Sequence, residues 1–201
     1  MTILPSVQGP RGLHQAIGRY GHPREWQCAY RVSGDELDYW RLVVAKRSAE
    51  VVLVLSRPGG VVLHTKAFYP AGAYRLLTGG VRPEEDLALA VQREAQEETG
   101  LNVTIDGFLG IIHHRFAHGE DVALLTSYVF SVHGPAGPLR SLDEEERITA
   151  YREVPVEALP EVARHLRALP PDWADWGRFR AVAHCLVYQA LGAPRMADAG
   201  P

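Results

Sequence analysis

Apolar residues along the chain form short runs typical of strands, separated by longer amphipathic segments typical of helices. Residues 51–55 are an uninterrupted apolar run, which predicts a fully buried strand. Residues 39–46 are also strand-like, and residues 61–64 resume extended structure after a Pro-Gly-Gly turn. A further strand is expected at 74–77. The first half of the chain therefore predicts several strands of one sheet.

The remaining pattern adds helices near both ends and two more strands. A short helix is expected over 13–20, and residues 1–12 before it look irregular. Residues 103–112 and 122–132 predict two strands joined across a turn at 118–121, followed by a Gly/Pro-rich surface loop at 134–138. Helices are expected over 156–169 and 173–191. Mixed strands with interspersed helices predict an α/β fold.

Residues 79–101, GGVRPEEDLALAVQREAQEETGL, place glycines and charged residues at fixed offsets across one loop and one helix. Each fixed residue is about a one-in-fifteen event, so seven in register have a chance probability on the order of 10⁻⁸ per starting point. The segment is therefore a motif rather than an accident. Its fixed positions are Gly79, Glu85, Arg93, Glu94, Glu97, Glu98 and Gly100.

The helix of this segment is expected from Asp86 to Glu98, with an end at Gly100. At about 100° per residue, Glu94 and Glu98 fall on the same stripe as the apolar residues of its first half, and Glu97 lies at the edge. Carboxylates turned toward a protein body are unfavourable without compensation, and oxygen-rich clusters suit magnesium or manganese. The alternative is a solvated acidic helix, which the complete spacing disfavours.

The pattern G-x5-E-x7-R-E-U-x-E-E-x-G-U, with U an aliphatic residue, is the Nudix box, and this sequence resembles a Nudix hydrolase. The resemblance implies an α/β/α sandwich with a mixed β-sheet. It also implies Mg²⁺- or Mn²⁺-dependent hydrolysis of diphosphate linkages in nucleoside diphosphate derivatives. Ala95, Glu84 and Thr78 depart from the usual residues at their positions, but none of these departures removes a ligand. We therefore expect an active enzyme.

The box residues receive expected roles in metal-assisted attack of water on phosphorus. The expected oxygen ligands of Mg²⁺ or Mn²⁺ are Glu94, Glu97 and Glu98, with Glu85 at the edge of the cluster and, as the resemblance suggests, a backbone carbonyl around Gly79. Arg93 cannot neutralise all these carboxylates, but its guanidinium can orient one of them by a forked hydrogen bond. Arg93 is therefore expected to hold a box glutamate in place.

The general base has two candidate sources. One is Glu94, since a carboxylate beside the metal can either bind it or take the proton. The other is the acidic run at 142–147, in which Glu145 and Glu146 are the main candidates beside Glu144. That run is also typical of a solvated loop. Both sources stay open at this point.

Composition fits an ordinary enzyme with a small-molecule substrate. The chain has 201 residues, 46% of them hydrophobic, and a formal charge of −3, which gives no reason to expect nucleic-acid binding. Cys28 and Cys185 lack metal or redox spacing, and no signal peptide or membrane span is apparent. We expect a cytoplasmic protein with an N-terminal extension (1–37), a hydrolase domain (38–160) and a C-terminal helical extension packed on it (161–201).

The substrate is expected to be a nucleotide-type small molecule, either a nucleoside triphosphate or a nucleoside diphosphate derivative. Side chains that could contact its phosphates are each more simply interpreted as surface charges; they are Arg57, Lys66, Arg75 and Arg115. An ordinary polar hairpin, rather than a metal site, is expected for His113, His114 and His118. Trp173 and Trp176 are expected to dock the last helix to the core.

Two functions of other classes compete with hydrolysis. The first is a Nudix-like regulator that binds a nucleotide derivative without cleaving it, which the intact box disfavours. The second is a metal-dependent isomerase of a diphosphate substrate. An isomerase of this kind would require an added cysteine or acid pair near the metal. If the chain forms an oligomer, a homodimer is expected.

Overall fold

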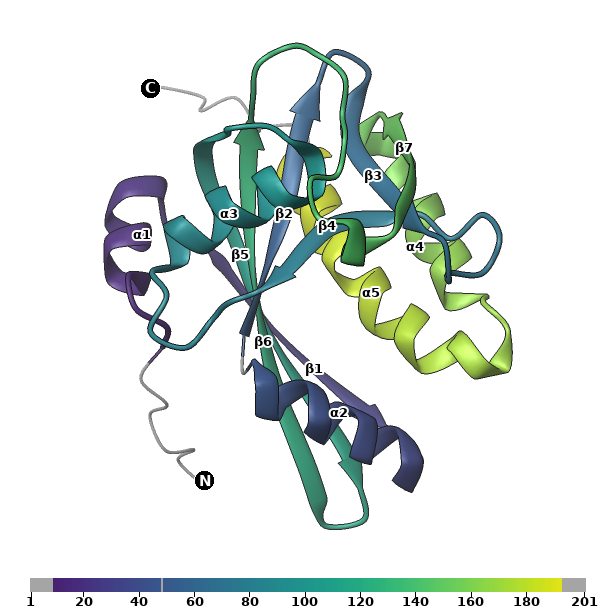
Figure 1. Cartoon of the computed structure of the whole chain (residues 1–201). Coiled ribbons are helices and arrows are strands. Elements are labelled where there is room, and N and C mark those ends of the chain that lie inside the picture. The colour runs from purple at the N-terminus through teal and green to yellow at the C-terminus, as the bar shows by residue number, and fades with distance from the viewer. Residues whose placement is uncertain (1–8, 48, 193–201) are drawn as a thin grey trace, which may run out of the picture.

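The computed structural model describes residues 9–47 and 49–192, and its strands form one mixed seven-stranded sheet (Figure 1). The strand order is β1-β5-β6-β2-β4-β3-β7. β1 pairs parallel with β5 and β2 pairs parallel with β6, whereas the other neighbours are antiparallel. The strands are β1 (Arg24–Arg31), β2 (Ala49–Arg57), β3 (Gly60–Lys66), β4 (Arg75–Gly80), β5 (Thr104–His118), β6 (Asp121–His133) and β7 (Ile148–Val154).

Helices cover both faces of this sheet, so the fold is the expected α/β/α sandwich. Figure 1 shows α1 and α3 together on one side and α4 and α5 together on the other. The helices are α1 (Leu13–Tyr20), α2 (Gly34–Lys46), α3 (Leu87–Thr99), α4 (Leu159–Arg167) and α5 (Ala174–Val187). Short 3-10 turns lie at η1 (Glu144–Glu146), η2 (Val156–Ala158) and η3 (Pro171–Trp173), and a π-helical turn at η4 (Tyr188–Gly192) follows α5.

Strand β2 lies at the centre of the sandwich and is buried on both faces. Its side chains alternate, so Val51 and Leu53 pack with the residues of α1 and α3, whereas Val52 and Val54 pack with those of α4 and α5. This confirms the fully buried strand predicted at 51–55. The helix at 13–20, the strands at 61–64 and 74–77, and the two strands across the turn at 118–121 are confirmed as well.

The predicted strand at 39–46 is wrong, because these residues belong to α2. Ser33 caps this helix, since its Oγ accepts a hydrogen bond from the backbone N–H of Glu36 at 3.2 Å. Leu37 and Trp40 are buried on one helical face. The Trp40 ring stacks on Phe116 at a centroid distance of 3.9 Å. Trp40, Val43 and Val44 of the predicted strand therefore pack on the inner face of a capped helix.

The ends of the chain contribute to the same sheet and its covering layer. β1 was not predicted, although Trp26, Cys28 and Tyr30 alternate along it and lie on its more buried face. The helices predicted at 156–169 and 173–191 correspond to η2 with α4, and to α5 with η4.

The domain boundaries at 37/38 and 160/161 stay a prediction. In the described part of the chain, no helix has the length and apolar character needed to cross a membrane.

The docking of α2 through Trp40 can be tested by replacing this residue with alanine. Trp40 is 2% exposed and contacts Phe116 and Phe179. We expect Trp40→Ala to lower the free energy of unfolding by about 3 kcal/mol, because the substitution leaves a cavity in an aromatic cluster. Leu42 on the same helix is 67% exposed. Leu42→Ala is the control and should change stability by less than about 0.5 kcal/mol in denaturant titrations. Equal effects of the two variants would contradict this packing.

The contact between α5 and β4 should make stability depend on pH through His184. Its Nδ1–H donates to the Arg180 carbonyl at 3.0 Å, and its Nε2 accepts from the backbone N–H of Leu76 at 3.2 Å. Burial lowers the pKa of His184 from 6.5 to about 4. The unfolded chain therefore takes up this proton first. Stability from this group is complete above about pH 6.5 and is lost as the pH falls toward 4.

A variant without this imidazole should lack that part of the acid sensitivity. We expect the free energy of unfolding of His184→Gln to fall less between pH 7 and pH 4.5 than that of the unsubstituted protein, by on the order of 2–3 kcal/mol. His113→Gln is the matched control, since His113 is 46% exposed. Parallel pH profiles for the His184 variant and the unsubstituted protein would show that His184 does not titrate in this way.

Candidate active site

Helix α3 turns the acidic half of the box toward the sheet. The Asp86 side chain caps its start, since Oδ1 accepts from the backbone N–H of Ala88 at 2.9 Å. Gly100 ends the helix in a left-handed conformation with φ of 75°. Between these caps, the stripe of apolar residues continues into Glu94 and Glu98, which are 5% and 0% exposed. The predicted inward orientation of these two carboxylates is thus confirmed.

Near the end of β4, just before the loop to α3, backbone and carboxylate come together at Gly79. A Cβ atom on Gly79 would lie 1.6 Å from Cδ of Glu94, so no larger residue fits while Glu94 keeps this position. The Glu94 carboxyl group therefore lies directly over the Gly79 backbone. Glu84, in the same loop, has a φ of 59°, in the left-handed region that favours glycine. The backbone at 84 thus adopts a conformation for which glycine would be the least strained residue.

Arg93 is the centre of a hydrogen-bond network within the box. Its Nε and Nη2 donate to the two carboxylate oxygens of Glu85 at 2.7 and 2.8 Å. Its Nη1 donates to Glu94 at 2.6 Å and to Glu97 at 2.8 Å, and Nη2 also donates to the Gly80 carbonyl at 2.8 Å. These hydrogen bonds hold the pKa of Glu85 below its usual value. The arginine expected to orient one glutamate contacts three.

Glu98 lies apart from this network and is fully buried. Its Oε2 accepts a hydrogen bond from the backbone N–H of Thr78 at 3.1 Å. Its Oε1 is 3.8 Å from Nδ1 of His64 and 3.7 Å from Nζ of Lys66, and no hydrogen-bond partner for it lies among the described residues. Burial raises the pKa of Glu98 to about 8, against the opposing effect of Arg75 and Lys66. An ionised Glu98 therefore needs further positive charge.

These donors fit a hard divalent cation by their chemistry. The unpartnered oxygen of Glu98 is a buried acceptor that a cation would satisfy. Burial also raises the pKa of Glu94, one turn away, despite its hydrogen bond to Arg93. Within residues 9–47 and 49–192, however, no three His, Cys, Asp or Glu side chains are placed to hold one ion together. Three of the box carboxylates point to Arg93 instead.

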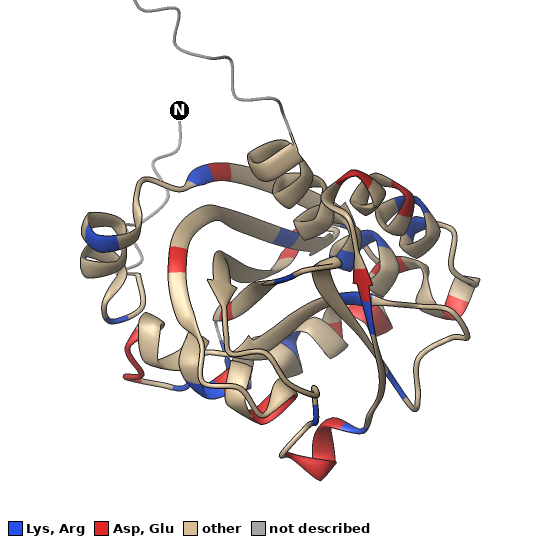
Figure 2. Cartoon of the chain, turned by 90° about the horizontal axis from the view of Figure 1, so that it is seen from above, with Lys and Arg blue, Asp and Glu red and all other residues tan. Residues whose placement is uncertain are grey.

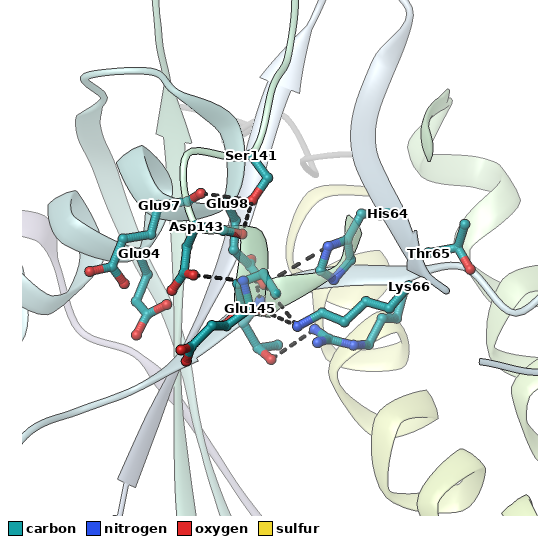
Figure 3. A network of polar contacts seen from close by, with 12 residues as sticks. His64, Thr65, Lys66, Glu94, Glu97, Glu98, Ser141, Asp143 and Glu145 are labelled. Atoms are coloured by element: carbon teal, nitrogen blue, oxygen red, sulfur yellow. Dashed lines mark hydrogen bonds and ion pairs between the residues drawn. The ribbon is translucent and has the colours of Figure 1, made fainter. Parts of the chain in front are cut away.

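The acidic run at 142–147 lies against the end of α3 (Figure 3). Ser141 Oγ donates to the Glu97 carbonyl at 3.1 Å, and the backbone N–H of Leu142 donates to the same carbonyl at 2.8 Å. Glu146 forms an ion pair with Lys66 and lines a cleft beside Glu94. Glu145 is exposed and does not line the cleft. Of the two glutamates predicted as candidate bases in this loop, the structure brings Glu146 into the site.

The cleft has a volume of about 370 Å³ and is lined by more cations than carboxylates. Figure 2 shows basic and acidic segments interspersed around the molecule as a whole, so this local excess is a feature of the cleft. Four of its cationic residues were not singled out in the sequence. They are Lys46 at the end of α2, Arg47 directly after it, Arg82 in the loop before α3, and Arg180 on α5. Lys66, Arg75 and Arg93 line the cleft as well.

The four side chains considered for phosphate binding differ in their solvent exposure. The surface interpretation is wrong for Lys66 and Arg75, because the Lys66 side chain is 10% exposed and Arg75 is 3% exposed, and both line the cleft. It is also wrong for Arg57, whose side chain is 15% exposed and pairs with Glu153. Arg115 is exposed, as expected.

The two tryptophans considered for substrate binding pack between elements of the fold instead. Trp173 and Trp176 pack against Tyr69 in the cluster around α4 and α5, which confirms their docking role. The predicted hairpin strand contains the histidines. His114 is buried there between Tyr30 Oη at 3.1 Å and Ser127 Oγ at 3.0 Å.

Comparisons with known proteins identify the family to which the chain belongs. A family model described as the NUDIX domain matches residues 45–175. The low-salt glycan biosynthesis protein Agl8 of Haloferax volcanii is 32% identical over 139 residues, which cover 66% of this chain and 88% of that protein. Among solved structures, the MutT NUDIX hydrolase from Burkholderia pseudomallei is 21% identical, with a TM-score of 0.47 and coverage of 70% of this chain and 98% of that one. The NUDIX hydrolase from Nitrosomonas europaea is 19% identical, with a TM-score of 0.48 and coverage of 77% and 100%.

The close approach at Gly79 gives a direct test of the site geometry. We expect Gly79→Ala to displace the Glu94 carboxyl group. Because the sequence predicts Glu94 as a ligand of Mg²⁺, we also expect this variant to bind Mg²⁺ at least about tenfold more weakly in calorimetric titrations. Gly18→Ala on α1 is the control, because nothing lies within 4 Å of a Cβ there. Circular dichroism should show both variants folded. A folded Gly79 variant with unchanged Mg²⁺ affinity would show that Glu94 does not need this position.

Proposed function

The chain belongs to the NUDIX domain family, and on this basis we propose that it hydrolyses a diphosphate linkage in a nucleotide-type substrate with the help of Mg²⁺ or Mn²⁺. The observation that carries the proposal is the fully buried Glu98, whose Oε1 has no hydrogen-bond partner among the described residues. This carboxylate lies beside Glu94 next to a cleft rich in cations. A buried acceptor without a partner is unfavourable unless a cation or a proton compensates it.

Glu94, Glu97 and Glu98 are the residues that would hold the cation, with Glu85 and the Gly79 carbonyl as further candidates. When bound, the cation would neutralise phosphate oxygens and lower the pKa of a water molecule. Glu98 is suited to this role because its backbone hydrogen bond from Thr78 fixes one oxygen and leaves the other available. Glu94 and Glu97 already accept from Arg93, so they would share their oxygens between the guanidinium and the cation.

Arg93 acts in this proposal as a positioning residue. Glu85 binds two of its nitrogens and fixes the plane of the guanidinium. The remaining nitrogen, Nη1, then holds Glu94 and Glu97 at a set distance from each other. Arg93 therefore reduces the repulsion between these carboxylates while keeping both beside the cleft.

The proton acceptor is proposed to be Glu94 or Glu146. Burial raises the pKa of Glu94, which brings its basicity closer to that required at neutral pH. Glu146 lines the cleft from the segment before β7, and its carboxylate forms an ion pair with Lys66. Glu145 has less support, since its side chain is exposed.

A nucleotide-binding regulator is the second candidate. The observation that favours it is the orientation of Glu85, Glu94 and Glu97 toward Arg93, because a set of carboxylates satisfied by an arginine has less need of a metal. Such a protein would bind a nucleotide derivative in the same cleft without cleaving it.

A panel of nucleoside triphosphates and nucleoside diphosphate derivatives, each with Mg²⁺ and with Mn²⁺, distinguishes the two functions. We expect product formation that stops when EDTA removes the metal. Glu98→Gln should lower kcat by about 10²-fold or more, because one oxygen and one charge of the metal site are lost. Glu120→Gln on the β5–β6 turn is the control, since this residue is exposed and does not line the cleft.

Three outcomes are informative. Wild-type turnover by the Glu98 variant would overturn the metal assignment. Tight binding of a nucleotide without any product would favour the regulator. Comparison of Glu94→Gln with Glu146→Gln identifies the proton acceptor, because the variant of that residue should lose the acidic limb of the pH–rate profile while the other keeps it.

A further inference from the structure

The cations that line the cleft fall into two groups according to their partners. In the first group, each cation is already bound to box or loop residues. Arg93 binds the box glutamates, Arg82 Nη2 lies 3.2 Å from Glu97, and Lys66 pairs with Glu146. Arg75 donates to Tyr69 Oη and to Thr78 Oγ1, each at 2.8 Å. Arg93, Lys66 and Arg75 hold the site together and have little capacity left for a ligand, whereas the Arg82 side chain is 63% exposed.

The second group consists of Lys46, Arg47 and Arg180. Within residues 9–47 and 49–192, no carboxylate oxygen lies within 4.0 Å of the Lys46 ammonium or of the Arg47 guanidinium. Lys46 is exposed and Arg47 is half-buried at the end of α2. Lys46 and Arg47, which have no carboxylate this close, are therefore available to a bound anion at the edge of the cleft.

Arg47 lies directly against the glycine pair of the box. A Cβ atom on Gly80 would lie 2.5 Å from Cδ of Arg47 and 3.1 Å from its Nη1. The same Gly80 accepts a hydrogen bond from Arg93 through its carbonyl. Arg47 is therefore next to the carboxylate cluster, although some thirty residues separate it from the box in the sequence.

Arg180 reaches the cleft from α5 and is held by a buried carboxylate. Its Nη1 lies 3.0 and 3.1 Å from the two oxygens of Glu50, which is 1% exposed. Ser127 Oγ donates to Glu50 at 2.9 Å and so fixes that carboxylate. The Arg180 Nε is buried and has no hydrogen-bond partner among the described residues. Arg180 thus lines the cleft, and Glu50 holds its guanidinium in place there.

From these contacts we propose that Lys46, Arg47 and Arg180 form a second phosphate-binding subsite, so that the substrate carries a phosphate group beyond the scissile diphosphate, as a nucleoside triphosphate does. The inference rests on the proposed function, in which the carboxylate cluster and its cation bind the scissile diphosphate. An additional phosphate brings charge that guanidinium and ammonium groups bind by charge-assisted hydrogen bonds. A diphosphate capped on both sides by neutral groups would leave Lys46 and Arg47 without an anionic partner and Arg180 paired only with Glu50.

Phosphonates with P–C–P bridges test this subsite without turnover. The probes are methylenediphosphonate and the corresponding bis(methylene)triphosphonate, measured by calorimetry with the full chain in Mg²⁺. We expect the triphosphonate to bind at least about tenfold more tightly than the diphosphonate, since it reaches additional cations. Equal affinity of the two probes would overturn the subsite.

Substitutions at the subsite should remove this difference selectively. We expect Arg47→Gln and Lys46→Gln together to weaken triphosphonate binding about tenfold and diphosphonate binding less than about twofold. Arg41→Gln, on the exposed face of the same helix, is the control and should change neither affinity. Equal weakening of both probes by the double variant would mean that the two residues contribute only general charge, which would contradict the proposal.

Arg180 needs a separate pair of variants, because its removal leaves Glu50 buried without its partner. Arg180→Lys keeps the charge and should retain a preference for the triphosphonate, whereas Arg180→Gln with Glu50→Gln removes both charges and should reduce it. Arg178→Gln is the control on the same helix, with a side chain that is 50% exposed. A folded double variant with an undiminished preference would remove Arg180 from the subsite.

These measurements remain separable from the proposed function. Loss of hydrolysis across the nucleotide panel, with a preserved triphosphonate preference, would reject the enzyme and keep the subsite. Hydrolysis of nucleoside diphosphate derivatives with higher kcat/KM than triphosphates, together with equal phosphonate affinities, would keep the enzyme and reject the subsite.

Discussion

Glu98 is buried between α3 and the end of β4, and the positions of the polar groups around it depend on this burial. A carboxylate with no solvent exposure is expensive to ionise, and here one oxygen receives only a backbone hydrogen bond from Thr78. His64 and Lys66 approach the other oxygen without reaching hydrogen-bond distance. The fold therefore keeps in its interior a carboxylate oxygen that lacks a hydrogen-bond partner among the described residues. Such an oxygen suits a group that binds a cation rather than one that stabilises the folded chain.

Arg93 solves a related problem for the other box carboxylates. Glu85, Glu94 and Glu97 come from one loop and two turns of one helix, and without a cation between them they would repel each other. The guanidinium can bind all three because its nitrogens lie in one plane and donate in several directions. The box is thus pre-organised by an internal cation, and its position is fixed further by the Gly80 carbonyl.

The box and the central strand could be predicted from the sequence because both depend on local patterns. The period of α3 places Glu94 and Glu98 inward, and the apolar run of β2 has no alternative to burial. The strand assigned to 39–46 failed because its aromatic and β-branched residues outweighed the Ser33-x-x-Glu36 capping signal before it. That signal was present and would have predicted α2.

No comparable pattern in the sequence indicates the cationic part of the cleft. Lys46, Arg47 and Arg180 are ordinary charged residues in the sequence, and they meet the box only because α2 and α5 pack on the same sheet. Arg75 has the pattern of a strand-end surface charge, yet tertiary packing buries it beside Tyr69 and Thr78. Contacts between residues so far apart in the chain depend on how elements pack, which one sequence does not contain.

The glycine pair at the end of β4 explains how acidic and basic groups meet in one cleft. Side chains of successive strand residues point to opposite faces of a sheet. A Cβ atom at Gly79 would meet the Glu94 carboxyl group, whereas one at Gly80 would meet the Arg47 side chain. Because neither glycine has a side chain, a carboxylate from α3 and a guanidinium from the end of α2 both approach the same short stretch of backbone. An anion lying across this stretch would have carboxylate oxygens on one side of it and cations on the other, and this is the distribution of charge that the proposed metal-bound polyphosphate requires.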